Sequence, residues 1–434
     1  MAKKVLISFV GKGQFADKDE AKKFASGYLP TTYMFNVNGV DTPKSSHIFV
    51  EALLESHMYE FSKIYLFGTN TSSWGMLIYD LAQKDEAVKI FWEELEESCS
   101  GSGIEDEQIE RLEILLRAKY GVHVIIRAHV ADIEEDSVDE VFNIYNSVAE
   151  EIPAKHDIIF DITHGFRSMP LLAYQSLLYN SATQQRRRID IIYAQLGLVK
   201  SGENKKSISF VRNLGRYWEL SEGALAVKLF KEKYDASMLV SLVPQYCAPV
   251  AELFRRFDDI VRFNLAHFVE PFMALACKIL ETNPLNEEWP LWMQDGYIEL
   301  VNVFNSVGDG EPVSQMLMNF SSLMHNKGLL VQSVIALRCA VEAKIIEQIN
   351  PAKVGDYDFW EKQGKVWLKE NRTVPSELKQ AIHSLAFLRN LVAHGGGDHN
   401  SSAYAFSASA LENKLFVAEK NVKKLFAILN GVDF

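Results

Sequence analysis

Three residues near the end of a helix-like segment have types and a spacing that could do chemistry. Arg389, Asn390 and His394 lie in the sequence LRNLVAHGGG at residues 388–397. Asn390 and His394 are four residues apart, so a helix places both on one face. Arg389 is five residues from His394, about 140° around the helix axis. The arginine and histidine of one chain therefore do not lie side by side, and a second copy across a two-fold axis would help a site that uses both.

These residue types fit the cleavage of RNA by its own 2′-hydroxyl group. The reaction needs a base near the 2′-hydroxyl, a cation for the charged phosphorane and a proton for the leaving 5′-oxygen. Histidine and arginine can supply these without a metal. The structural alternative is a histidine that the helix dipole favours at a helix C-terminus, with the arginine on an ordinary surface. Spacing alone leaves both interpretations open.

A second set of candidates lies in three polar loops, each of which follows a predicted strand. The loops are VGKGQFA (10–16), GTNTSSWG (68–75) and THGFRSMP (163–170). Ligands of parallel sheets bind beyond the carboxyl ends of the strands. Glycines let a backbone approach a ligand, whereas hydroxyl groups and helix N-termini offer donors to a phosphate or simply cap a helix.

The first loop also fits the G-x-G-x-x-A form of a dinucleotide-binding fingerprint, through Gly11, Gly13 and Ala16. A nucleotide-dependent oxidoreductase is therefore one hypothesis. The context does not favour it, because the following residues give no good apolar helix face. The next predicted strand ends at Asn36 and Asn38, without the acid that would bind a ribose.

The third loop has two further interpretations. A buried strand ends at Asp161, and Thr163 and His164 follow it before a helix that begins near Arg167 or Ser168. These groups could bind a ligand, or Asp161, Thr163 and His164 could form a catalytic acid–base set. A histidine at a strand end can also be purely structural.

The elements that position these loops predict an α/β domain. Apolar, β-branched or aromatic runs alternate with longer amphipathic stretches, which is typical of βαβ units with a mainly parallel sheet and helices on both faces. The predicted strands are 5–10, 32–37, 63–68, 122–130, 156–163, 189–197 and 207–212, and the clearest helical stretches between them are 46–61, 74–98 and 138–152.

After about residue 215 the strand pattern stops and helical periodicity continues to the end. The stretches 216–234, 328–349 and 376–394 are the clearest examples, and Leu378, Ile382 and Leu385 give the last of them a buried face. The chain therefore predicts an α/β domain followed by an all-α region.

Composition excludes several classes of protein. The 434 residues carry 45 Lys and Arg against 57 Asp and Glu, a net charge of −12, which argues against a protein that coats nucleic acid through a general basic surface. Four scattered cysteines predict reduced, buried thiols. No apolar run reaches the roughly 18–20 residues of a membrane span, and the N-terminus begins with a strand pattern. These features predict a cytoplasmic protein.

Two motifs, in this order, resemble a known protein family. Arg389-Asn390-(three residues)-His394, near the end of a helical region, resembles the HEPN ribonuclease motif. DITHGFRSMP (161–170), together with the early glycine loop and GTNTSSW (68–74), is similar to the CARF domain of CRISPR-associated proteins. The combination resembles the CARF–HEPN ancillary ribonucleases of type III CRISPR systems, with the middle of the chain matched only loosely.

The resemblance implies a Rossmann-like CARF domain over 1–215, a helical connecting segment over 216–300 and an all-helical HEPN ribonuclease domain over 301–434. It implies a homodimer or a higher even-numbered oligomer, with no DNA or membrane partner. Two CARF domains share one pocket for a cyclic oligoadenylate, with the tetra-adenylate favoured over the hexa-adenylate. The residues that this pocket would use are Gly11, Lys12, Gly13, Gly68, Thr69, Asn70, Thr71, Ser72, Ser73, Thr163, His164, Gly165, Phe166, Arg167 and Ser168.

The resemblance also implies the chemistry of the second site. Binding of the messenger activates metal-independent cleavage of single-stranded RNA, with 2′,3′-cyclic phosphate and 5′-hydroxyl products. By position, Arg389 stabilises the phosphate, His394 transfers a proton or stabilises the transition state, and Asn390 orients them. Glu342 is a weaker candidate for orienting Arg389. The alternative function is a ligand-sensing regulatory protein without nuclease activity.

Overall fold

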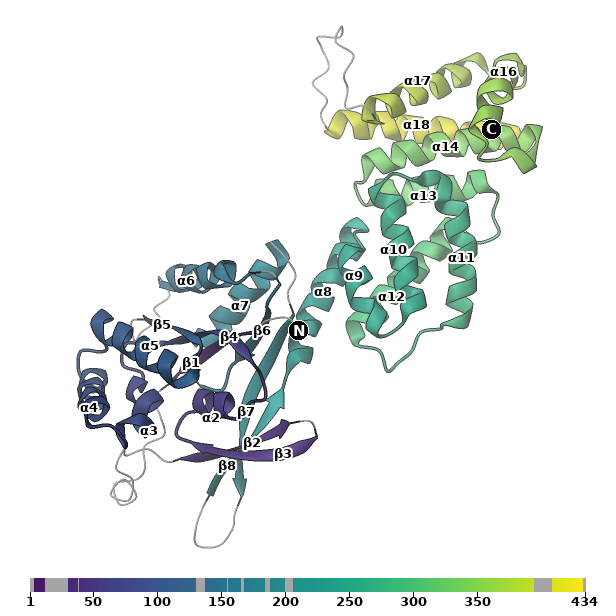
Figure 1. The fold of residues 1–434 in the computed structure, drawn as a ribbon. Helices are drawn as coiled ribbons and strands as arrows, with labels where there is room; N and C mark the ends of the chain where they lie inside the picture. The colour runs from purple at the N-terminus through teal and green to yellow at the C-terminus, as the bar shows by residue number, and fades with distance from the viewer. Residues whose placement is uncertain are drawn as a thin grey trace. The chain divides into compact units, whose positions relative to one another are not determined.

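The computed structural model describes residues 4–11, 30–37, 39–129, 137–153, 155–164, 168–183, 188–199, 206–393 and 408–431. The chain divides into two compact units, Met1–Ser221 and Glu222–Phe434. We describe each unit by itself (Figure 1). The further division of the helical half at residue 300 stays a prediction.

The first unit is built on one eight-stranded sheet in the order β3-β2-β8-β7-β6-β1-β4-β5. Five neighbouring strands, from β7 to β5, run parallel, whereas β8 pairs antiparallel with β7 and β3 pairs antiparallel with β2. The strands are β1 (Lys4–Val10), β2 (Thr31–Val37), β3 (Val40–Ser46), β4 (Phe61–Thr69), β5 (His123–His129), β6 (Asp157–Asp161), β7 (Ile189–Val199) and β8 (Lys206–Asn213).

Helices cover both faces of this sheet (Figure 1). One apolar core joins the sheet to α2, η1, α4 and α5, and a second core joins the other face to α6, α7 and the start of α8. The central strands are buried on both sides, which explains their nearly continuous apolar sequences. The helical elements are α2 (Phe49–Glu55), η1 (Trp74–Ile78), α3 (Tyr79–Ala82), α4 (Glu86–Ser100), α5 (Asp106–Tyr120), α6 (Val138–Glu151), α7 (Ser168–Thr183) and α8 (Gly215–Lys233).

The order of the strands determines where the site lies. β4 and β5 lie on one side of β1, whereas β6 and β7 lie on its other side. The direction of the connections therefore reverses at β1, and a ligand crevice is expected at the carboxyl ends of β1 and its neighbours. In the sheet, β6, β7 and β8 separate β2 from β1. The neighbour of β1 on the other side is β4, which ends in Gly68 and Thr69 and offers no acid that could bind a ribose.

The structure differs from the sequence pattern at two places in this unit. The predicted helix over 74–98 is broken, because Asp85 accepts hydrogen bonds from Ala87 N and Val88 N and so begins α4 there. The strand β3 is missing from the predictions because it is an edge strand with a proline, Pro43, and mostly exposed polar residues.

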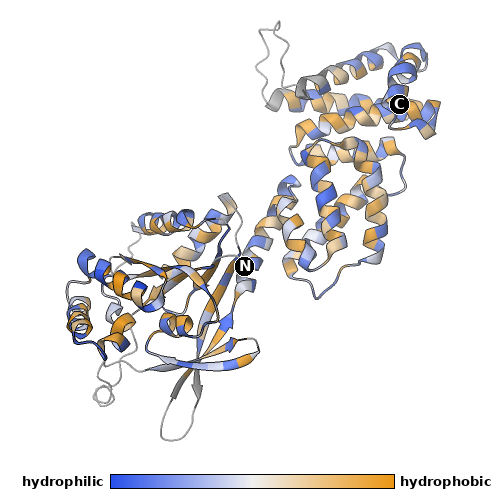
Figure 2. Ribbon diagram, viewed as in Figure 1, coloured by the Kyte–Doolittle hydropathy of each residue, from blue (hydrophilic) through white to orange (hydrophobic). Residues whose placement is uncertain are grey.

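The second unit is all helical. Its helices share one core of buried residues that extends from Ala226 to Phe426, and Figure 2 shows hydrophobic and hydrophilic residues alternating along α10 and α11. The elements after α8 are α9 (Ser237–Leu242), η3 (Val243–Gln245), α10 (Ala248–Arg262), η4 (Ala266–Phe268), α11 (Val269–Thr282), α12 (Leu291–Val307), α13 (Val313–Asn326), α14 (Leu330–Ile349), η5 (Pro351–Lys353), α15 (Tyr357–Phe359), η6 (Trp360–Gly364), α16 (Lys365–Glu370), α17 (Ser376–Ala393) and α18 (Ala408–Leu429).

The helix α14 is central to this unit, because it packs against α13, α17 and α18. Ser321 of α13 and Ser333 of α14 each donate a hydrogen bond to the other's backbone carbonyl, both at 2.9 Å. Such short side chains allow the two helices to approach closely. The packing of α14 against α17 brings the side chains of these two helices together.

The predicted fold class is confirmed: an α/β unit with a mainly parallel sheet precedes an all-α unit. The prediction of buried thiols needs a correction. All four cysteines are free, but each is only partly buried. No helix within the described ranges is long and apolar enough to cross a bilayer.

Candidate functional site

The described beginnings of the three predicted loops lie at the same carboxyl edge of the sheet. β6, β1 and β4 are neighbours, so the ends of these strands bring Asp161, Gly11 and Gly68 to the same edge. One hydrogen bond joins two strand ends, and another joins two loops. Ser8 Oγ of β1 donates to Asp161 Oδ2 of β6 at 2.6 Å, and Ser73 N of the loop after β4 donates to Gly11 O after β1 at 3.1 Å.

Asp161 holds the turn after β6 and is not open to a ligand. Its side chain is fully buried, and its second oxygen accepts a hydrogen bond from Thr163 N at 2.8 Å. Burial raises the pKa of Asp161 to about 6, although the hydrogen bonds from Ser8 and Thr163 oppose the shift. The geometry therefore favours a structural role for this carboxyl group over a place in an acid–base set.

The side chain of Thr163 also has a structural role in this turn. Its Oγ1 accepts a hydrogen bond from Ala194 N of β7 at 2.9 Å, while its own N–H binds Asp161. The hydroxyl thus joins the turn to the neighbouring strand. Sequence reasoning offered this hydroxyl to a ligand, but the fold uses it internally.

His164 links the turn to a helix from another part of the chain. Its Nε2 accepts a hydrogen bond from Phe49 N, at the start of α2, at 3.3 Å. Burial lowers the pKa of His164 to about 4, so the ring is neutral and carries its proton on Nδ1. Tyr33, which sequence reasoning did not single out, places its hydroxyl 3.5 Å from the same Nε2.

The loop after β4 is also held by its own side chains. Ser72 Oγ accepts from Thr69 N at 2.9 Å, and the buried indole of Trp74 donates to Thr69 O at 2.9 Å. A Cβ added to Gly68 would lie 2.6 Å from the Trp74 ring, so the loop requires glycine there. In the part of the chain that the structure describes, the buried Oδ1 of Asn70 has no hydrogen-bond partner, and such atoms usually have one.

Of the other predicted ligand residues, two are at least partly exposed and five lie outside the described residues. Thr71 is partly exposed in the same loop, and Ser168 is exposed at the first position of α7. Lys12, Gly13, Gly165, Phe166 and Arg167 lie outside the described residues.

We expect the pH dependence of stability to change when His164 is replaced by glutamine. Unfolded chains protonate a histidine near pH 6.5, whereas the folded chain does so near 4, so the wild type loses stability as pH falls through this interval. Asp161, whose pKa is raised to about 6, acts in the opposite direction, since its protonated form is favoured by folding. The difference between the two proteins therefore isolates the histidine.

Urea unfolding at pH 7.5 and 4.5 measures this effect. The wild type should lose roughly 2 kcal/mol more than His164→Gln between these pH values. His123→Gln, at an exposed histidine of β5, serves as the matched control and should follow the wild type. Parallel pH profiles for His164→Gln and the wild type would contradict the prediction.

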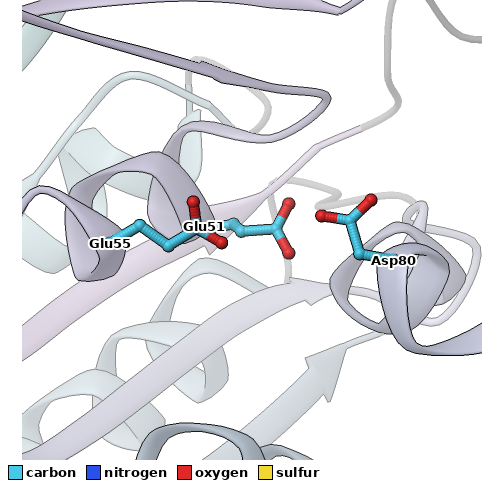
Figure 3. Close-up of side chains that lie close together, drawn as sticks. All are labelled: Glu51, Glu55 and Asp80. Atoms are coloured by element: carbon cyan, nitrogen blue, oxygen red, sulfur yellow. The ribbon is translucent and has the colours of Figure 1, made fainter. Parts of the chain in front are cut away.

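One group of three carboxylates in the described residues lies close enough together to hold a metal ion. Oxygens of Glu51, Glu55 and Asp80 lie within 4.8 Å of one another (Figure 3). Glu51 already has partners: Lys119 Nζ donates to its Oε1, and Ser46 Oγ donates to its Oε2 at 2.5 Å. Burial raises the pKa of Glu51 and Lys119 opposes that shift, so the ammonium group supplies positive charge to this cluster.

The predicted catalytic arginine lies beside a cavity of the second unit. Arg389 is exposed on α17 and lines a cavity of about 680 Å³ that α14 and the η6 turn also line. Asn390 belongs to α17, but its side chain lies outside the described part, as does the whole of His394. The structure therefore gives the surroundings of the arginine alone.

Glu342 faces the same cavity as Arg389. Burial raises the pKa of Glu342, whereas the charges of Arg338 and Arg389 lower it, so this carboxyl group lies within electrostatic reach of both arginines. Arg338 Nε donates to Glu342 Oε1 at 2.9 Å, and the Arg338 guanidinium lies 4.9 Å from the centre of the Trp360 ring. Sequence reasoning named Glu342 but missed Arg338 and Trp360, because only the fold places α14 beside the η6 turn.

The thiol in this cavity is not a nucleophile at neutral pH. Burial raises the pKa of Cys339 to about 12, with Glu342 adding to the shift and the two arginines opposing it. Only a thiolate reacts readily. The groups available here are therefore guanidinium and ammonium groups, several carboxyl groups and aromatic rings.

Comparison with known proteins agrees with the architecture of the first unit. Residues 5–195 match the family described as CRISPR system endoribonuclease Csx1, CARF domain. CRISPR-associated protein MJ1674 of Methanocaldococcus jannaschii is 22% identical over 277 residues, which cover 60% of this chain and 41% of that protein. The chain thus spans about two fifths of the length of this relative. Enterococcus italicus Csm6 bound to cyclic hexa-2′-fluoro-hexa-dAMP aligns with a TM-score of 0.39 and 12% identity, covering 100% of this chain and 96% of that chain.

Proposed function

The chain is a CRISPR-associated protein whose residues 5–195 form a CARF domain, and from this premise we propose that it is a ribonuclease switched on by a cyclic oligoadenylate. The messenger binds at the carboxyl edge of the sheet, and single-stranded RNA is cut in the helical unit without a metal. The meeting of three loops at the ligand edge of a CARF-family sheet is the observation that carries this proposal.

Some hydroxyl groups at this edge have structural roles. Those of Thr163 and Ser72 are used within the fold, whereas Thr71 is partly exposed and Ser168 is exposed at the first position of α7. The α7 N-terminus suits a phosphate. The ring we favour is the tetra-adenylate, with the hexa-adenylate second.

A homodimer is part of the proposal. A helix that continued to His394 would separate it from Arg389 by about 140° around the axis, so a second copy across a two-fold axis would help to bring one of each together. An apolar groove of about 570 Å³ beside β6 and β7 offers the first unit a surface for a second copy. Leu171 and Tyr217, which line it, are 59% and 62% exposed, and such patches are typical of protein interfaces.

In the helical unit, Arg389 stabilises the phosphorane, His394 transfers a proton or stabilises the transition state, and Asn390 orients them. Glu342, held by Arg338, limits the positions that Arg389 can adopt. Residues 301–434 carry 14 Lys and Arg against 13 Asp and Glu, so this predicted domain is close to neutral although the chain as a whole is at −12. It therefore repels RNA less than the rest of the chain does.

A cleavage assay tests the proposal. Single-stranded RNA with a fluorophore and a quencher is incubated with the full-length protein in excess EDTA, with cyclic tetra-adenylate, cyclic hexa-adenylate or neither. We expect one ring to raise the cleavage rate by about tenfold or more. The same ring should raise the melting temperature, because a ligand that binds only the folded state stabilises it.

Two controls separate the outcomes. Asp80→Asn alters the carboxylate group that could hold a cation, and this variant should cleave like the wild type. A melting shift without any cleavage would identify a ligand sensor that is not a nuclease. Cleavage that requires an added divalent metal would overturn the metal-independent mechanism.

A further inference from the structure

We propose that the cavity beside Arg389 binds the base of one nucleotide next to the cut, and that it prefers bases with an exocyclic amino group. This inference rests on the proposed function, because it assumes that RNA reaches Arg389. Its volume of about 680 Å³ lies within the range of known small-molecule sites. Arg389 belongs to the lining, so a phosphate bound there brings an adjoining base to the cavity.

Tyr357 is the aromatic side chain that a base can reach. It lines the cavity and is 65% exposed, whereas Trp360 is 2% exposed and has the Arg338 guanidinium over its ring. Lys365 and, to a smaller extent, Tyr357 lower the pKa of Glu361, so the Tyr357 hydroxyl lies near that carboxylate. Aromatic side chains are the usual stacking partners of unpaired bases.

The charges of the cavity favour a base over a second phosphate. Its four acids outnumber its three permanently charged bases, and one histidine, His267, also lines it; the acids are Glu270, Glu342, Asp356 and Glu361, and the bases are Arg338, Lys365 and Arg389. Carboxylates accept hydrogen bonds from the amino groups of adenine, cytosine and guanine, and uracil has no such group.

Glu270 is the carboxylate best placed to read the base. Glu342, Glu361 and Asp356 have basic partners, at 2.9 Å from Arg338, 2.6 Å from Lys365 and 3.2 Å from Lys353. Glu270 is exposed, lines the cavity and makes no ion pair within the described residues. Its carboxylate can therefore bind a base without first breaking a salt bridge.

The wall that carries Tyr357 and Glu361 is irregular. The segment Trp360–Gly364 forms a π-helical turn between α15 and α16. A Cβ on Gly364 would lie 2.4 Å from the Trp360 ring, so this turn requires a glycine. π-Helical turns occur frequently at functional sites, and here the turn forms part of the cavity wall.

RNA binding without cleavage tests the inference independently of the nuclease reaction. The probes are 2′-O-methyl oligouridines with a single central A, C, G or U, which cannot use a 2′-hydroxyl to cut themselves. Fluorescence anisotropy on the full chain should show amino-bearing bases bound about tenfold more tightly than uracil. Tyr357→Ala should weaken binding of every probe by about tenfold, and Tyr357→Phe should restore most of it.

Glu270→Gln should remove the preference for amino-bearing bases and leave uracil binding unchanged. Phe263→Ala is the matched control, since Phe263 is 62% exposed in the same unit and does not line the cavity. Equal binding of all four probes by the wild type, or unchanged binding by both Tyr357→Ala and Glu270→Gln, overturns the inference. A wild type that never cleaves RNA but shows these binding differences would overturn only the proposed nuclease activity.

Discussion

Replacing Arg389 with alanine is expected to lower messenger-activated RNA cleavage by about 10²- to 10³-fold. A guanidinium group aimed at the developing phosphorane stabilises charge that is greater in the transition state than in the substrate, and loss of such a donor has effects of this size. Arg389 is exposed on α17, so its removal should leave the fold intact. Single-turnover rates with saturating activator measure the effect.

One control variant keeps the positive charge at residue 389, and another removes an exposed arginine elsewhere in the helical unit. Arg389→Lys keeps the charge but loses the planar pair of donors, so we expect partial activity at best. Arg256→Ala removes an exposed arginine of α10 in the same unit and should cleave normally. Both Arg389 variants should keep the messenger-induced melting shift. Full cleavage by Arg389→Ala would remove this residue from the mechanism.

Replacing Lys119 with methionine is expected to destabilise the first unit by about 3–5 kcal/mol. The lysine is the ion-pair partner of Glu51, whose side chain is almost completely buried, and a buried carboxylate that loses its cation is strongly unfavourable. The loss should grow as pH rises, because burial raises the pKa of Glu51 and protonation relieves the charge only at lower pH. Urea unfolding, followed by circular dichroism, measures the transition.

A double variant and an exposed pair provide the controls. Lys119→Met combined with Glu51→Gln should recover most of the lost stability, since no unpaired charge remains. Lys89→Met breaks the exposed pair with Glu86, and should cost at most about 1 kcal/mol. A loss for Lys119→Met that is no larger than for Lys89→Met would contradict the argument.

The sequence predicts much of the fold because the central strands are buried on both faces. Short, almost continuous apolar runs such as those at β1 and β6 are typical of strands inside a parallel sheet, and their positions are confirmed to within a few residues. β3 lacks this signal, although Asn38-Gly39 before it is the strongest two-residue indicator of a hairpin. α5 buries only a narrow stripe, with Leu112 and Leu116 as its buried residues. Because the rest of its sequence is strongly charged, the helical pattern of apolar residues is weak there.

The edge at which the loops meet was predictable, but the use of each side chain was not. The carboxyl ends of parallel strands must share an edge, so Gly11, Gly68 and Asp161 could be grouped without coordinates. Whether a hydroxyl points to a ligand or to its own backbone depends on contacts between distant segments. Thr163 binds a strand 31 residues away in sequence, and no local pattern contains that information.

The hydrogen bond between His164 and Phe49 has a mechanical consequence. It joins two segments 115 residues apart in sequence, so a displacement of the turn after β6 would either break this bond or shift the start of α2. α2 follows directly on β3, and β3 is hydrogen-bonded along its length to β2. The turn at the ligand edge is thereby connected, through α2 and β3, to the outermost hairpin of the sheet.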